Sequence, residues 1–180
     1  MPIEELRIEV VRHTNLAPEA LTEILALAHR AYNRDLSAYY YHLPAPTHVI
    51  AHSGDSIVSH ALWVTRWLQV NDNPLLRTAY VELVATEPSH QRHGFATAVM
   101  QKLVDAVQDF DLAALCPSDR GVRLYERLGW QFWRGPLSIR TADGLLPTPE
   151  EQLMFLSLPA TPLLDPTFPI SAEWRPDDLW

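Results

Sequence analysis

One carboxylate, one glycine-containing turn and one phenol stand out as groups that could do chemistry. Glu82 interrupts an otherwise apolar strand, Tyr80–Thr86, and the turn Gln91–Thr97 follows it. Tyr125 lies further along, in the run Leu-Tyr-Glu-Arg-Leu-Gly-Trp. A carboxylate can accept a proton from an ammonium group, directly or through water, and a phenol can protonate a departing thiolate. Together these groups could support acyl transfer from a thioester to an amine.

The turn has the pattern Gln-x-x-Gly-x-Ala and lies between a predicted strand and a predicted helix. Backbone N–H groups and the positive end of the helix dipole would converge there on one point, where a pyrophosphate can bind. Gly94 would let the backbone approach a phosphate closely. An ordinary glycine turn into a helix is the alternative. The predicted phosphate loop consists of Gln91, Arg92, His93, Gly94, Phe95, Ala96 and Thr97.

The strand before the turn offers a second set of backbone groups. If a bulge separates this strand from the next, N–H and C=O groups of Val84, Ala85 and Thr86 could pair with the amides of a pantetheine arm, like an added strand. For Glu82 the alternative is a position on the solvated face of an alternating strand, shared with Thr78.

Tyr125 is predicted on a helix that begins near Ser118, a candidate N-cap that could also contact the pantetheine arm. The alternative for Tyr125 is a core aromatic residue one helical turn before Leu128. Cys116 is predicted to be a small buried hydrophobic residue at the end of a strand, and an acyl-carrying nucleophile is the alternative.

Composition restricts the class of protein. The chain has 180 residues, and we expect one domain, 1–180, with a single core. The net charge of −8 argues against a nucleic-acid binder and is compatible with a cationic substrate, although solubility alone would also explain it. One cysteine, no signal peptide and no bilayer-length apolar run predict a cytoplasmic protein with no membrane partner. No His-Glu-x-x-His motif is present, and no metal is expected.

Hydrophobic periodicity predicts the element order β-α-α-β-β-β-α-β-α-β-β, which indicates a mixed α/β sheet. The Pro-rich tail, 159–180, contains several large apolar residues, so we expect it to pack back on the domain. The predicted early elements are a strand at 6–11, a helix from Pro18, a short helix at 36–41, hairpin strands at 48–51 and 57–64, and a long strand at 77–86.

The order of features from Tyr80 to Trp130 resembles the acetyl-CoA motif of the Gcn5-related N-acetyltransferases (GNAT). The resemblance implies the GNAT acyl-CoA N-acyltransferase fold, with a mixed central sheet, a splayed strand pair and flanking helices. It also implies acetyl-CoA as cosubstrate, Glu82 as general base and Tyr125 as general acid.

Within that superfamily the chain most resembles the aminoglycoside 2′-N-acetyltransferases. The resemblance rests on Asn33–Leu36, Trp133–Pro136, Thr148–Glu151 and Glu173–Trp180. It implies a homodimer and a cationic aminoglycoside, either kasugamycin or a deoxystreptamine compound, held by separated carboxylates. The implied substrate ligands are Asp35, Glu82, Glu151, Asp178 and the carboxylate of Trp180.

If that carboxylate binds substrate, deleting Trp180 should raise the substrate KM with little loss of thermal stability. Two alternatives to the aminoglycoside reading stay open. One is acetylation of another small amine, and the other is a non-catalytic acyl-CoA-binding regulatory domain.

Overall fold

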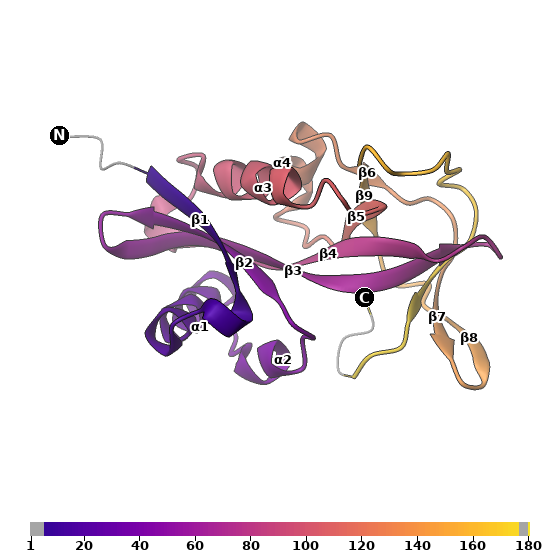
Figure 1. Cartoon of the computed structure of the whole chain (residues 1–180), viewed down its shortest axis with the longest axis horizontal. Helices are drawn as coiled ribbons and strands as arrows, with labels where there is room; N and C mark the ends of the chain where they lie inside the picture. The colour runs from indigo at the N-terminus through magenta and orange to yellow at the C-terminus, as the bar shows by residue number, and fades with distance from the viewer. Residues whose placement is uncertain (1–5, 177–179) are drawn as a thin grey trace. The chain divides into compact units, whose positions relative to one another are not determined.

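The computed structural model of the chain describes residues 6–176 and 180, which form two compact units. The first unit contains residues 6–64 and 82–106, and the second contains 65–81, 107–176 and 180. Strands β3 (Ser56–Val70) and β4 (Leu76–Thr86) each begin in one unit and end in the other (Figure 1).

The first unit is a sheet with helices on both faces (Figure 1). Strand β1 (Leu6–Arg12) pairs antiparallel with β2 (Thr47–Ser53), which pairs antiparallel with the start of β3. Helices α1 (Pro18–Tyr32) and α2 (Ser37–Tyr41) cover one face, and α3 (Phe95–Ala106) covers the other. Short 3-10 helices lie at His13–Asn15 and Pro88–His90.

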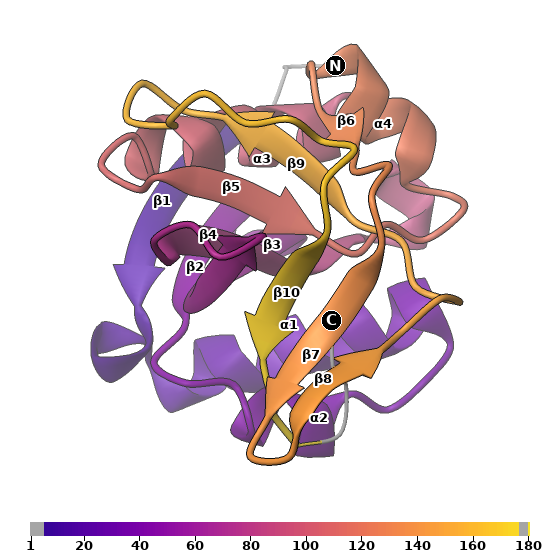
Figure 2. The same cartoon turned by 90° about the vertical axis from the view of Figure 1, so that its right-hand side faces the viewer.

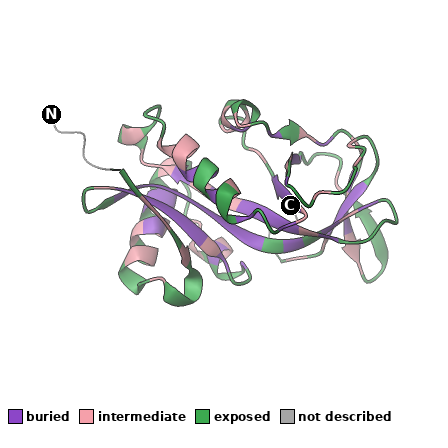
Figure 3. Cartoon of the chain, turned by 45° about the horizontal axis from the view of Figure 1, so that its top comes forward, coloured by how far each residue is buried: buried purple, intermediate pink, exposed green. Residues whose placement is uncertain are grey.

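Helix α1 shows why the sequence pattern predicts this unit well. Pro18 occupies the first turn, where its missing N–H breaks no helical hydrogen bond, and the helix ends at Asn33 in the left-handed conformation (φ 52°). Its buried residues, which include Ile24 and Leu27, pack against Ile50 of β2 and Ile57 of β3. Strands β2 and β3 are largely buried, whereas β1 and the outer surface of α1 are exposed or half-buried (Figure 3).

The second unit is built from short strands around the first part of β4 and the last part of β3. The strand order is β6-β9-β5-β4-β3-β10-β7-β8, with β5 parallel to β4 and β10 parallel to β7. Figure 2 shows β10, from the Pro-rich tail, beside the β7–β8 hairpin. The bounds are β5 (Leu112–Leu115), α4 (Val122–Arg127), β6 (Gln131–Phe132), β7 (Leu137–Thr141), β8 (Gly144–Pro147), β9 (Met154–Ser157) and β10 (Ile170–Glu173).

The mixed α/β sheet with flanking helices confirms the predicted fold class, but some details of the second unit differ. In the described part of the chain five strands, not two, follow α4, because strands of two to five residues carry too little alternation to be recognised. Helix α4 begins at Val122 with Gly121 at its N-cap, so the N-cap prediction for Ser118 is wrong. Ser118 instead opens the preceding turn, where its carbonyl accepts from the Gly121 amide at 2.8 Å.

The prediction of a buried Cys116 is also wrong. Cys116 follows the end of β5 and is exposed, and its Sγ lies 3.8 Å from Oε2 of Glu151. Among the residues described, no helix has the length and apolarity that a bilayer crossing requires.

Candidate active site

Strand β4 changes conformation directly after Glu82. Glu82 is half-buried, and the next residue, Leu83, has a φ of 49°, in the left-handed region that a leucine rarely adopts. The pairing of β4 with β5 covers Thr78–Tyr80, whereas β4 itself continues to Thr86. The strand therefore carries a local kink beside the candidate base, in the region where the sequence analysis places a bulge.

Side chains of the first unit hold three consecutive carbonyls at this kink. We call Leu83, Val84 and Ala85 the carbonyl triplet. A carbonyl oxygen has two lone pairs, so a side-chain hydrogen bond does not by itself exclude a second donor. The predicted pantetheine contacts of Val84, Ala85 and Thr86 therefore stay a prediction. The bonds run from His60 Nδ1 to Leu83 (3.0 Å), from the Tyr32 hydroxyl to Val84 (2.8 Å) and from Ser59 Oγ to Ala85 (3.2 Å).

The charge of Glu82 also affects the pKa of Tyr32. Although 42% of Tyr32 is exposed, burial around its phenol and the nearby charge of Glu82 raise the pKa of Tyr32 to about 12. The phenol therefore stays protonated at neutral pH and remains a donor to Val84. The charge of Glu82 thus lies close to the carbonyl triplet.

The predicted phosphate loop forms an exposed turn into α3. Residues 91–94 are exposed, and both Arg92 (φ 65°) and Gly94 (φ 87°) are left-handed. The Gly94 carbonyl accepts from the Ala98 amide at 3.0 Å, and α3 begins at Phe95. A Cβ atom added to Gly94 would meet nothing within 4 Å, so the space in front of the turn is open to a ligand.

We expect Gly94→Val to weaken acetyl-CoA binding at least tenfold. A β-branched side chain disfavours the positive φ and would project into the open space where a phosphate would bind. The measurement is calorimetric titration with acetyl-CoA. Gly144→Val is the matched control, because Gly144 also has a positive φ (122°) and open space around it but is the first residue of β8. Equal affinity in the two variants would contradict the phosphate-loop assignment.

Asp35, a predicted substrate ligand of the first unit, is exposed between α1 and α2. Its Oδ1 accepts from the Ser37 amide at 2.9 Å, and hydrogen bonds from Ser37 lower the pKa of the Asp35 carboxyl below its ordinary value. Asp35 is therefore ionised at neutral pH, as a ligand for an ammonium group must be.

The second unit contains the predicted acid, Tyr125, and several other predicted residues. Tyr125 is buried on α4, with its ring centroid 6.1 Å from that of Trp130. A Cβ on Gly121 would come within 2.7 Å of the Tyr125 ring, so the absence of a side chain there leaves room for the phenol. Ser118 and Glu151 are both exposed.

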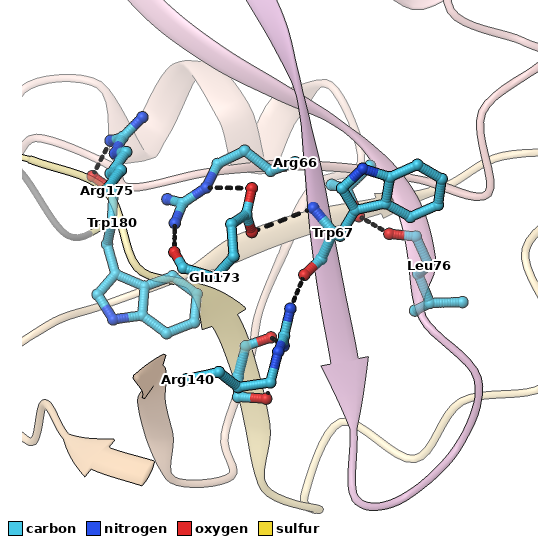
Figure 4. Close-up of polar contacts among 9 residues, drawn as sticks. Arg66, Trp67, Leu76, Arg140, Glu173, Arg175 and Trp180 are labelled. Carbon is cyan, nitrogen blue, oxygen red and sulfur yellow. Dashed lines mark hydrogen bonds and ion pairs between the residues drawn. The ribbon is translucent and has the colours of Figure 1, made fainter. Parts of the chain in front are cut away.

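The chain end is anchored, not frayed. The side chain of Trp180 is buried, and its Nε1 donates to Thr148 Oγ1 at 2.8 Å. The backbone oxygen of Trp180 accepts from Arg175 Nη2 at 2.7 Å (Figure 4). The predicted ligand Asp178 lies outside the described residues.

A network of polar contacts in the second unit, centred on one buried arginine, was not predicted from the sequence (Figure 4). Arg66 is buried in β3, donates to the Glu173 carbonyl at 2.7 Å and lies 4.8 Å from the centroid of the Tyr80 ring. The Glu173 carboxylate lies 3.6 Å from Arg66 Nε and accepts from the Trp67 amide at 3.1 Å. These contacts hold β10, in the Pro-rich tail, against β3. The feature of the sequence that could have indicated these contacts is a single arginine within a largely apolar strand.

Two buried histidines were also not predicted from the sequence. They are His48 on β2 and His60 on β3, whose rings are joined by a hydrogen bond of 2.9 Å. Burial lowers the pKa of His48 to about 4 and that of His60 to about 3, and the repulsion of other histidines adds to both effects. Both rings are therefore neutral at physiological pH. Among the residues described, no three His, Cys, Asp or Glu side chains are grouped as metal ligands.

We expect the free energy of unfolding to decrease as the pH falls from 6.5 toward 4. In that window an unfolded chain binds protons at His48 and His60, whereas the folded chain does not, so acid favours unfolding. Each histidine can contribute at most about 1.4 kcal/mol per pH unit. Urea unfolding at pH 7 and pH 5 measures the change, and the double variant His48→Asn/His60→Asn should show a shallower decrease. Parallel curves for the two proteins would contradict the prediction.

The kinked strand, the glycine turn and the helix that follows define the class of the protein as a GNAT-type acyl-CoA N-acyltransferase fold. The family model described as an acetyltransferase (GNAT) domain matches residues 12–133. This chain belongs to the GNAT acetyltransferase family. The family implies acetyl-CoA as the cosubstrate and an amine as the acceptor.

Comparisons with individual proteins agree with that assignment. An aminoglycoside 2′-N-acetyltransferase of Mycolicibacterium fortuitum is 36% identical over 136 residues, covering 73% of this chain and 69% of that relative. An acyl-CoA N-acyltransferase structure from Pseudomonas aeruginosa has a TM-score of 0.60 at 11% identity, covering 85% of this chain and 100% of its own. Eis1 of Mycobacterium abscessus has a TM-score of 0.61 at 18% identity. The match covers 74% of this chain but only 33% of the Eis1 chain. The two structures show a shared fold.

Proposed function

We propose that the protein transfers the acetyl group of acetyl-CoA to the 2′-amine of an aminoglycoside and so confers resistance to it. The observation that carries the proposal is the 36% identity to an aminoglycoside 2′-N-acetyltransferase over 73% of this chain. In the proposed reaction the free amine attacks the thioester carbon, a C–N bond forms and the C–S bond breaks. Glu82 takes the amine proton through water, and Tyr125 gives a proton to the departing thiolate.

The position of Glu82 supports its role as base. It is half-buried and lies directly before the kink at Leu83, next to the segment proposed to hold the pantetheine arm. A carboxylate at this place can both attract an ammonium group and accept its proton. The role of Tyr125 is supported by its burial, which keeps the phenol away from bulk water.

The charge of the protein supports a polycationic substrate. The net charge is −8, and the ionised Asp35 is available on the first unit. We propose Asp35, Glu82, Glu151, Asp178 and the Trp180 carboxylate as substrate ligands, with Ser118 as a further contact to the pantetheine arm. Kasugamycin and the deoxystreptamine aminoglycosides are the candidate substrates. We further propose a cytoplasmic homodimer.

The test measures free CoA release with kasugamycin, gentamicin, tobramycin and a linear polyamine. Mass spectrometry and NMR then locate the acetyl group on the product. An aminoglycoside with a hydroxyl at position 2′ is the matched negative substrate. We expect acetylation of 2′-amines only. Activity on the polyamine alone would replace the proposal with a different small-amine acetyltransferase, and acetyl-CoA binding without CoA release would indicate a regulatory domain.

Tyr125→Phe is expected to lower kcat by about a hundredfold while the fold and both KM values stay near those of the wild type, because only the proton donor is removed. Circular dichroism checks the fold, and CoA release measures the rate. A Tyr125→Phe variant with the full wild-type kcat would show that the thiolate takes its proton from solvent and that Tyr125 is a core aromatic residue.

A further inference from the structure

A chain of hydrogen bonds in the first unit runs from helix α2 to the kink of β4. Tyr40 Oη lies 3.2 Å from His48 Nε2, His48 Nδ1 lies 2.9 Å from His60 Nε2, and His60 Nδ1 lies 3.0 Å from the carbonyl of Leu83. Both histidine rings are fully buried, and Tyr40 is buried as well. The proposed reaction assigns no role to these three side chains.

The strand register explains why the two rings meet. His60 is opposite Ile50, and His48 is opposite Leu62, so the two histidines are diagonal neighbours on the same face of the β2–β3 pair. Helix α2 places Tyr40 beside this face, with its ring centroid 5.8 Å from that of His48. Side chains from α2, β2 and β3 therefore form one series of hydrogen bonds that ends at a carbonyl of β4.

The Leu83 carbonyl, at one end of this series of hydrogen bonds, determines where each proton in the series lies. The Leu83 carbonyl can only accept, so His60 carries its proton on Nδ1 and accepts on Nε2. His48 must then donate from Nδ1 and accept on Nε2, where Tyr40 donates its phenolic proton. All three side chains are neutral in this arrangement. A second proton on His60 would set two N–H groups against each other at the contact with His48.

We propose that Tyr40, His48 and His60 form a positioning chain that holds the Leu83 carbonyl and with it the left-handed kink of β4. This inference rests on the proposed acetyl-CoA contacts of Val84, Ala85 and Thr86, because the Leu83 carbonyl and the Val84 amide share one peptide plane, from which the segment continues. The chain is not a proton relay, because an amide carbonyl accepts a hydrogen bond but passes no proton on. His60 is therefore a positioning residue for the cosubstrate and not a catalytic residue.

The central experiment compares three substitutions of His60. Asparagine can place its amide N–H near the position of Nδ1 and still donate to Leu83, whereas glutamine extends toward His48 and leucine donates nothing. We expect His60→Leu and His60→Gln to raise the acetyl-CoA KM about tenfold, the effect of losing one buried hydrogen bond, with the amine KM unchanged. His60→Asn should restore most of the affinity. The readouts are the two KM values, kcat and titration with acetyl-CoA.

His52→Leu is the matched control on the same strand pair. His52 is also a buried histidine on β2, but it bonds to Glu9 at 2.8 Å and not to β4. We expect its acetyl-CoA KM to equal that of the wild type. A rise equal to that of His60→Leu would show a general effect of removing a buried histidine and would overturn the positioning role.

The outcomes separate this inference from the proposed function. If the wild type binds acetyl-CoA and His60→Leu or His60→Gln binds it equally well, the positioning chain is overturned and the cosubstrate assignment stands. If the wild type binds no acetyl-CoA, the cosubstrate assignment fails and the inference fails with it. If His60→Leu does not fold, the test is the comparison of His60→Asn with His60→Gln. Equal acetyl-CoA affinity in these two variants would also overturn the proposal.

Discussion

Replacing Glu82 with glutamine is expected to lower kcat about a hundredfold or more, because the amine loses its proton acceptor. The acetyl-CoA affinity should change little, since the carbonyl triplet and the glycine turn stay in place. Loss of the general base should also change the pH–rate profile relative to that of the wild type. Steady-state CoA release between pH 5 and pH 9 measures both effects.

Glu87→Gln is the control for this variant. Glu87 follows the end of β4, and its carboxylate is bound by Arg30 at 2.7 Å, so it is engaged in a structural ion pair. We expect this variant to keep wild-type turnover and pH dependence. If Glu82→Gln behaves as Glu87→Gln does, Glu82 is a solvated strand residue, as the alternative interpretation of the sequence holds.

Deleting Trp180 is expected to lower the free energy of unfolding by about 3–5 kcal/mol, the usual loss when a buried tryptophan side chain is removed. The sequence alone predicts little loss of stability, and the burial of this indole and its bond to Thr148 argue against that prediction. The proposed substrate role predicts in addition a rise of about tenfold or more in the aminoglycoside KM, because the carboxylate moves. Urea unfolding and initial rates measure the two effects.

A single glycine added after Trp180 separates the two contributions. It keeps the indole but converts the carboxylate of Trp180 into a neutral amide and moves the terminal charge away. We expect a raised substrate KM with nearly wild-type stability. A wild-type KM in the extended protein would show that Trp180 has only a structural role. Its backbone oxygen would then bind Arg175 and not the substrate.

Local patterns account for the parts of the fold that the sequence predicts. Helix α1 has apolar residues at helical spacing after Pro18, and the glycine turn before α3 needs the positive φ that Gly94 adopts. The hairpin of β2 and β3 surrounds Gly54. Each of these signals lies within a few residues of the feature it predicts. The second unit has weaker signals, because its strands after α4 are only two to five residues long.

The sequence by itself determined the order of the main elements and the family, and it placed Glu82, Gly94 and Tyr125 as candidate site residues. The left-handed conformation of Leu83 was decided by tertiary structure, because the groups that hold the carbonyl triplet are Tyr32, Ser59 and His60, far from it in the chain. The same is true of the indole of Trp180, which is buried through contacts with distant residues. Periodicity reports which face a residue occupies, but hydrogen bonds between elements depend on how the elements pack, and a single strand or helix does not contain that information.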